Sequence, residues 1–126
     1  MARKVLIAAG DVTLSATLRD TPTADAIWDA LPISGRVMTW GCEIYFSTSL
    51  SISRDADAKS VMEPGEIAFW PDGSAIAVGF GPTPISQADE IRLASPSNVW
   101  ADADGDVRMF ETVSAGEDVS VTRLTG

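Results

Sequence analysis

The sequence predicts an all-β protein, built as a closed antiparallel barrel of about eight strands with one short α-helix. Short stretches in which apolar and polar residues alternate recur along the chain, and turn residues separate them about every 8–12 residues. Only one stretch has the apolar period of a helix. With 126 residues, 45% of them hydrophobic, the chain is long enough to bury a core, and we expect one domain over residues 1–126.

The first two expected strands form a hairpin. Lys4–Ala9 is a compact apolar run, and in Val12–Arg19 the apolar residues alternate with Thr and Ser. Gly10 and Asp11 between them are residues that reverse a chain in tight turns. The alternation predicts that one face of the second strand is buried.

The one expected helix begins after Thr21 and ends before Pro32. Thr21 is a favourable N-cap, and Pro22 fits the first helical position. Four apolar residues at the spacing i, i+3, i+4 and i+7 form one stripe: Ala24, Ile27, Trp28 and Leu31. Because a helix of about ten residues is marginal alone, this stripe is expected to pack on the sheet or close a barrel end.

The next two expected strands are Ile33–Trp40 and Glu43–Ser49, joined by Gly41 and Cys42. Their alternation places Trp40 and Tyr45 on the face opposite Ile44 and Phe46. Asp55–Lys59 follows as a polar connection.

Glu63–Ser86 has the densest turn signals in the chain. It predicts a turn at Glu63–Glu66, a strand Ile67–Trp70, a tight turn Pro71–Gly73, a strand Ser74–Phe80 and a stiff exit Gly81–Pro84. Pro71 presets φ for the tight turn, and Gly73 is expected to take the positive φ that reverses the chain.

The last third predicts short strands and turns. The expected elements are strands at Glu90–Leu93 and Asn98–Ala101, an acidic turn at Asp102–Asp106, a single helical turn at Val107–Val113 and a final strand from Val119 to Leu124. Ser95 and Pro96 separate the first two, because proline cannot donate a hydrogen bond inside a central strand.

The composition excludes several classes of function. The chain has no histidine and one cysteine, which excludes Ser-His-Asp and Cys-His catalytic sites and structural zinc. Its net charge of −9, with the basic residues scattered, makes nucleic acid and anionic membranes poor partners. The acidic run at Asp102 lacks the glycine and glutamate positions of an EF-hand calcium loop. We expect no metal and no cofactor.

The lone Cys42 cannot form an internal disulfide, which suits a reducing compartment. Met1–Gly10 has too short an apolar run for a signal peptide or a membrane span. These two features predict a cytoplasmic protein. Cys42 itself is expected to be a half-buried thiol rather than a nucleophile, because the sequence places no basic residue beside it.

Several motifs resemble, in the same order, those of the small bacterial and archaeal cyclophilin-like proteins. They are Thr21–Ala24, Ala30–Ile33, Trp40–Phe46, Gly65–Gly73, Gly79–Pro84 and Ala94–Val99. The resemblance covers the chain from about Val12 to Val99, and it implies a minimal cyclophilin-type eight-stranded barrel in a family of largely unassigned function. The family pattern has an acidic residue where this chain has Cys42, so a role that requires that carboxylate is not carried over.

The resemblance does not bring the prolyl isomerase activity of true cyclophilins with it. Those enzymes place an Arg ahead of a Phe-Met-x-Gln-Gly-Gly segment, with a Trp and a His on the rim of the groove. Here Arg36-Val37-Met38 precedes Trp40-Gly41 without the Gln or the second Gly, and no His exists.

The candidate site is an apolar groove lined by aromatic residues, with a charged pair beside it. The candidate ligand-binding residues are Arg36, Trp40, Glu43, Tyr45, Trp70, Phe80, Pro82 and Thr83. Each has an alternative interpretation. The rings can fill the barrel interior, Arg36 and Glu43 can form a surface ion pair, and Gly79 and Gly81 before Thr83 can mark a barrel corner rather than a close approach to a ligand.

The leading hypothesis is a binding module for a small molecule or a peptide. One alternative is an enzyme, either a degenerate prolyl isomerase acting through Arg36 or a carboxylate-based activity through Glu43. Another is an oligomeric interaction protein in which the aromatic cluster is an interface, and the sequence leaves monomer or homo-oligomer open.

Overall fold

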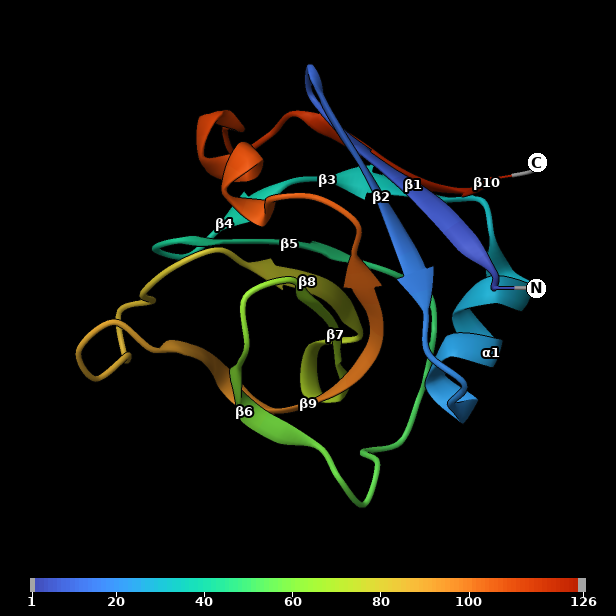
Figure 1. Cartoon of the computed structure of the whole chain (residues 1–126), viewed down its shortest axis with the longest axis horizontal. Coiled ribbons are helices and arrows are strands. Elements are labelled where there is room, and N and C mark those ends of the chain that lie inside the picture. Colours follow the sequence, from blue (N-terminus) through green and yellow to red (C-terminus); the bar gives the residue numbers. More distant parts are fainter. Residues whose placement is uncertain (1, 125–126) are drawn as a thin grey trace.

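The computed structural model describes residues 2–124 of the chain. Strands make up most of its regular secondary structure, with one α-helix and two short 3-10 helices (Figure 1). In chain order the elements are β1 (Lys4–Ala9), β2 (Val12–Leu18), α1 (Pro22–Ala30), β3 (Ile33–Arg36), β4 (Met38–Thr39), β5 (Glu43–Ser47), β6 (Lys59–Met62), β7 (Glu66–Trp70), η1 (Pro71–Gly73), β8 (Ala75–Gly79), β9 (Ile91–Ala103), η2 (Val107–Thr112) and β10 (Asp118–Leu124).

All the described strand pairs are antiparallel, so the predicted all-β class with one α-helix is confirmed. The sheet follows the order β3-β10-β1-β2-β9-β7-β8-β5-β4, and β6 pairs with β9 outside this path. The sheet has ten strands rather than the eight expected. Within residues 2–124 no ladder joins its end strands β3 and β4 to each other, so hydrogen-bonded closure of a barrel is not observed.

Two of the strands come from one predicted strand, Ile33–Trp40, which breaks at Val37. The Val37 N–H donates to the carbonyl oxygen of Glu117 (2.9 Å), and its own carbonyl accepts from Gly116 (2.8 Å). β3 before this point pairs with β10, and β4 after it pairs with β5. The strand β6 lies where the sequence predicts the end of a polar connection.

β9 is one continuous strand of 13 residues, which corrects the prediction of two strands separated by Ser95 and Pro96 (Figure 1). Its first part pairs with β6, and its last part lies between β7 and β2 and pairs with both. Pro96 lies within the part that pairs with β6, between Arg92 and Ser97, where the register shifts between Lys59 and Val61. A residue without an N–H is tolerated at such a bulge, so Pro96 does not end the strand.

The predicted helix is confirmed as α1. The Thr21 hydroxyl accepts a hydrogen bond from the Ala24 N–H (3.1 Å), which caps the helix as expected. Ala24 and Ile27 are fully buried in the main core. Trp28 is partly buried against the same core, and the Arg123 guanidinium lies 4.6 Å from the centroid of the Trp28 ring.

The β7–β8 hairpin is also confirmed, with Pro71–Gly73 forming η1 as its turn. The residue that takes positive φ is Ser74 (φ 50°) and not Gly73, which corrects the prediction. Gly73 is needed for a different reason, because a Cβ there would lie 2.3 Å from a carbon of the Trp70 ring.

The strands β5, β7 and β8 have two buried faces. One face, with Ile44, Phe46, Phe69 and Ile76, belongs to the main core. The other face belongs to a smaller cluster under β6 and β9: Met62, Ala68, Ala77, Ile91 and Leu93, with Tyr45 and Val99 packed against it. The candidate site lies on this second face.

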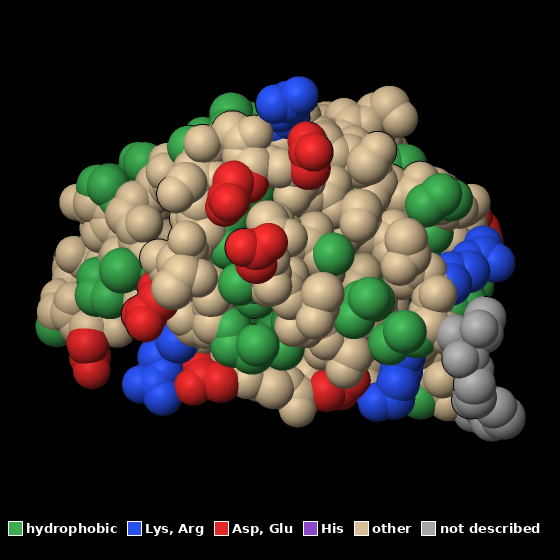
Figure 2. Space-filling model, turned by 90° about the horizontal axis from the view of Figure 1, so that it is seen from above, with side chains coloured by type: hydrophobic (Ala, Val, Ile, Leu, Met, Phe, Trp, Pro, Cys, Tyr) green, Lys and Arg blue, Asp and Glu red, His purple; other side chains and the backbone are tan. Residues whose placement is uncertain are grey.

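The acidic stretch Asp102–Asp106, which begins in the last residues of β9, is held in ion pairs. Asp102 pairs with Arg19 (2.7 Å), Asp104 with Lys4 (3.0 Å) and Asp106 with Arg108 (2.8 Å). On the face shown in Figure 2 the acidic side chains are scattered and the basic ones lie apart from one another. Across residues 2–124 no helix is long and apolar enough to span a bilayer.

Candidate functional site

A cavity of about 200 Å³ opens on the second face of the sheet. It is lined by Trp40, Glu43, Tyr45, Trp70, Leu93 and Ala94. Four of these residues are candidates from the sequence, and the fold brings them together from the β4–β5 turn, from β5 and from the end of β7.

Strand register explains why the cavity forms here. Glu43 and Tyr45 are two residues apart on β5 and therefore face the same side. Across the ladder their partners on β8 are Gly79 and Ala77, and the partner of Trp70 is Ala75. Because these partners on β8 have small side chains, they leave space on this face of the sheet. The large side chains of β5 and β7 border that space and form the walls of the cavity.

Tyr45 and Trp70 form two of the walls. Their rings meet edge to face, with 6.2 Å between centroids and 90° between planes. The Trp70 Nε1–H donates to the Ser95 hydroxyl (2.7 Å), and this hydroxyl donates to Asp72 (2.9 Å). Trp70 is therefore fixed by β9 on one side and by Gly73 on the other.

Trp40 stands on a tight turn. Its N–H donates to the carbonyl oxygen of Glu43 (3.0 Å), and Gly41 between them has φ of +61°. Trp40 and Tyr45 are both half-buried, so part of each ring is accessible to solvent.

Phe80, Pro82 and Thr83 do not line the cavity. The Phe80 N–H donates to the Cys42 carbonyl (2.8 Å), and the Cys42 N–H donates to the Pro82 carbonyl (2.9 Å). The Phe80 ring packs against the main core, in line with its alternative interpretation. The buried Thr83 hydroxyl donates to the Arg92 carbonyl. These residues hold in place the turn that carries Trp40.

Glu43 is the polar group of the cavity. Its side chain is only 6% exposed, and its Oε1 has no hydrogen-bond partner among the described residues. Burial raises the pKa of Glu43 from 4.5 to about 7, because desolvation disfavours the charged carboxylate. An unpartnered buried polar atom costs about 1–3 kcal/mol.

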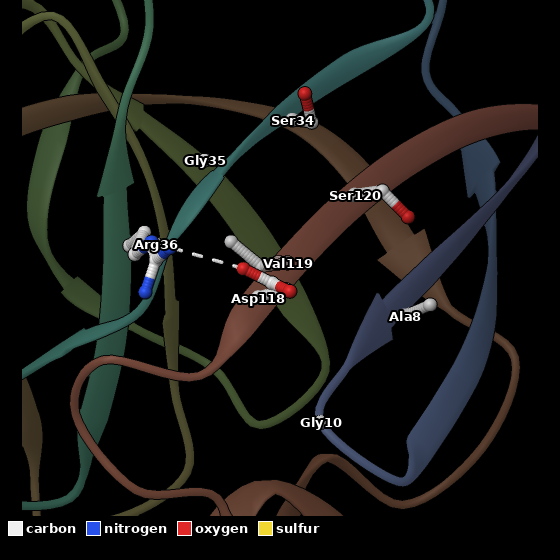
Figure 3. Close-up of a pocket in the computed structure, with 8 residues that line it drawn as sticks. All are labelled: Ala8, Gly10, Ser34, Gly35, Arg36, Asp118, Val119 and Ser120. Carbon is white, nitrogen blue, oxygen red and sulfur yellow. Dashed lines mark ion pairs between the residues drawn. The ribbon is translucent and has the colours of Figure 1, made fainter.

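Arg36 lies elsewhere, so the predicted pair with Glu43 is not formed. Its guanidinium is 3.7 Å from Asp118, and both side chains are largely exposed. They stand beside a hollow of about 540 Å³ over β3, β10 and β1 (Figure 3). Although larger than the Glu43 cavity, this hollow is lined mainly by short side chains on open strands, and none of its lining residues has an unpartnered buried polar atom.

Cys42 is half-buried and unpaired, as expected of a thiol at this turn. Residues 2–124 contain no group of three His, Cys, Asp or Glu side chains placed to hold a metal ion.

The sequence reasoning missed Leu93 and Ala94 as lining residues. Both lie in the part of β9 that pairs with β6 across the second face. The signal available in sequence was the apolar run at the start of β9, but only long-range pairing brings it over β5 and β7.

The chain is similar to known proteins over nearly its whole length. The family model described as cyclophilin-like matches residues 3–122. A hypothetical protein from Archaeoglobus fulgidus, AF2241, with a structure solved in solution, shares 35% identity with a TM-score of 0.82, over 98% of this chain and 95% of that one.

A second solved structure, McbB in complex with tryptophan, shares 15% identity with a TM-score of 0.72, over 97% of this chain and 45% of McbB. This likeness concerns the fold alone. Among curated proteins no sequence matches the chain. Because the family model matches almost the whole chain and the archaeal relative is 35% identical over 98% of it, this chain belongs to the cyclophilin-like family.

Proposed function

We propose that this protein binds a small organic molecule, with the apolar part of the ligand between Trp40, Tyr45 and Trp70 and its polar end at Glu43. The observation that carries the proposal is the buried, unpartnered Oε1 of Glu43 in a cavity with aromatic walls. Ligand sites combine apolar and aromatic linings with a few placed polar groups in this way.

The size of the cavity limits the ligand. Pockets for drug-sized molecules span about 300–1,000 Å³, and this cavity has about 200 Å³. A compact molecule with one ring fits this volume, whereas a peptide would enter with a single side chain. McbB, of which 45% matches this fold, has been solved in complex with tryptophan, a molecule with an aromatic ring.

The same carboxyl group favours a second candidate function, proton transfer to or from a bound substrate. A pKa of about 7 lets Glu43 hold or release a proton near neutral pH, which general acid–base catalysis requires. The isomerase alternative has no such support, because Arg36 lies outside the cavity.

Tryptophan fluorescence and thermal unfolding during titration with a library of small organic molecules test the proposal. A true ligand changes the emission and raises the melting temperature; Trp40→Phe weakens both effects. Trp28→Phe is the matched control, because Trp28 lies on α1 outside the cavity, and it is expected to leave binding unchanged. Recovering the hit unchanged supports binding alone, and recovering a product supports proton-transfer catalysis.

Two results would overturn the proposal. One is a library that leaves both signals of the wild type unchanged. The other is a hit whose binding is weakened equally by Trp28→Phe and Trp40→Phe.

A further inference from the structure

The surroundings of Glu43 restrict the chemistry of its ligand. The side chains that share its cavity are Trp40, Tyr45, Trp70, Leu93 and Ala94, and Tyr45 is the one titratable group among them. The chain neighbour of Leu93 on β9, Arg92, is bonded to Glu90 at 2.6 Å. Burial is the single cause of the raised pKa of Glu43, so no cation of the described chain compensates this carboxyl group.

A site with a buried carboxyl group and no cation disfavours anionic ligands. It lacks a positive partner for a ligand carboxylate or phosphate, and the net charge of −9 repels such groups from the whole molecule. A donor N–H group, in contrast, can bond the carboxyl group of Glu43, which lines the cavity, and a charged donor forms the stronger bond.

The aromatic walls point in the same direction. Faces of Trp and Tyr rings attract cations, most strongly where water is excluded. Three such rings border the cavity that contains Glu43. An ammonium group on a small apolar body satisfies the rings and the carboxylate together.

We infer that the cavity is selective for small organic amines, with the protonated amine donating to Glu43 and the apolar body lying between the rings. This inference rests on the proposed function and adds the chemical class of the ligand. Binding of the cation favours the carboxylate form of Glu43, so below neutral pH the proton of the carboxyl group passes to solvent as the amine binds. The apparent affinity therefore rises about tenfold from pH 5 to pH 6 and about fivefold from pH 6 to pH 7, and it levels off above pH 7, following the ionised fraction of Glu43.

Three probes of one shape test the inference: 2-phenylethylamine, 2-phenylethanol and 3-phenylpropionate. They are titrated into the wild type between pH 5 and pH 8, with tryptophan emission and calorimetry as readouts. We expect the amine to bind about tenfold or more tightly than the alcohol at pH 8, since a charge-assisted bond replaces a neutral one. The carboxylate is expected to bind most weakly, and amine binding at pH 6 should release a proton.

Glu43→Gln is expected to remove the preference for the amine and its pH dependence while 2-phenylethanol still binds. Glu111→Gln removes the same charge from an exposed position on η2 and should change neither, which controls for the net charge. A matched thermal melt verifies that each variant is folded.

The outcomes separate the two proposals. If the alcohol or the carboxylate binds as tightly as the amine, or amine affinity is flat from pH 5 to pH 7, the amine inference is overturned and the binding function stands. If the amine leaves both readouts unchanged, the inference is overturned as well. If the wider library is also without effect, the proposed function fails with it.

Discussion

Gly73 determines the position of the Trp70 ring, which forms one wall of the cavity. A Cβ at Gly73 would lie 2.3 and 2.4 Å from two carbons of the Trp70 ring. Cβ atoms in protein structures essentially never come closer than 3.0 Å to another heavy atom of this kind. The backbone at this position does not need glycine, since the positive φ of the hairpin falls on Ser74. Gly73 is required because the indole lies against it.

Replacing Gly73 by Ala is expected to displace the Trp70 ring and stretch its hydrogen bond to Ser95. Overpacking of this kind costs about 1–3 kcal/mol, and part of it should appear as weaker ligand binding. Melting temperature and titration with 2-phenylethylamine measure the two effects.

Gly35→Ala is the matched control for Gly73→Ala. A Cβ at Gly35, on β3, would lie 3.5 Å from its nearest atom, which is an ordinary contact. Gly35 does not line the cavity that contains Glu43. If Gly35→Ala and Gly73→Ala weakened binding equally, the role of Gly73 would be refuted.

At the scale of elements, one buried amide joins three segments. The Asn98 side chain on β9 is 1% exposed. Its Oδ1 accepts from the Asp55 N–H (2.8 Å), and its Nδ2 donates to the Ser53 carbonyl (2.9 Å) and to the Thr23 hydroxyl (3.1 Å). These bonds hold the segment before β6 and the start of α1 against the sheet.

We expect Asn98→Ala to lower the free energy of unfolding by about 2–4 kcal/mol, because buried backbone groups lose their partners. Urea unfolding measures this loss. Gln87→Ala removes an exposed amide side chain and should change stability by no more than about 0.5 kcal/mol. A loss at Asn98 as small as this would mean that the segment before β6 is held by other contacts.

Local signals explain which elements the sequence predicts. The hairpin at Gly10, the cap at Thr21 and the turn at Pro71 each depend on residues within about five positions, and all three are confirmed. The break at Val37 and the continuity of β9 through Pro96 depend on partners about 30 to 80 residues away. Periodicity contains no information on such partners.

The candidate site likewise has one part that local sequence signals predict and another that depends on long-range pairing. Alternation along one strand correctly places Glu43 and Tyr45 on one face, and the β7–β8 hairpin adds Trp70 beside them. The sequence could not separate Arg36 from Glu43, because the strand break at Val37 sends Arg36 to the β10 side. The binding role of these residues stays a prediction until a ligand is found.

At the scale of the whole molecule, some of the carboxylates are paired with basic side chains although the net charge is −9. Burial alone would raise the pKa of Glu66, but hydrogen bonds from Lys59, from the Glu63 backbone and from Arg19 outweigh it and hold this pKa below its usual value. The pKa of Asp102 is likewise lowered, mainly by its hydrogen bond from Arg19. Folded-state pKa values below the unfolded ones stabilise the protein above pH 4–5 and lose this effect as pH falls.

Glu43 has the opposite effect on the pH dependence of stability from that of Glu66 and Asp102. Its folded pKa of about 7 lies above the ordinary 4.5, so the folded state holds its proton more tightly than the unfolded chain does. Stability therefore falls as pH rises from about 4.5 to 7, by on the order of 3 kcal/mol in all. Because the chain has no histidine, few other side chains titrate in this window.

The two effects together predict a stability maximum near pH 5, measurable by urea unfolding between pH 3 and pH 8. Below the maximum the ion-paired carboxylates are protonated, and above it the buried Glu43 must ionise. In Glu43→Gln the free energy of unfolding should still fall as the pH drops below 5, but most of its decline between pH 5 and pH 7 should disappear. In Glu111→Gln both changes should remain. Equal declines in wild type and Glu43→Gln would show that Glu43 is not the buried acid, and the pH dependence expected for amine binding would then lose its physical cause.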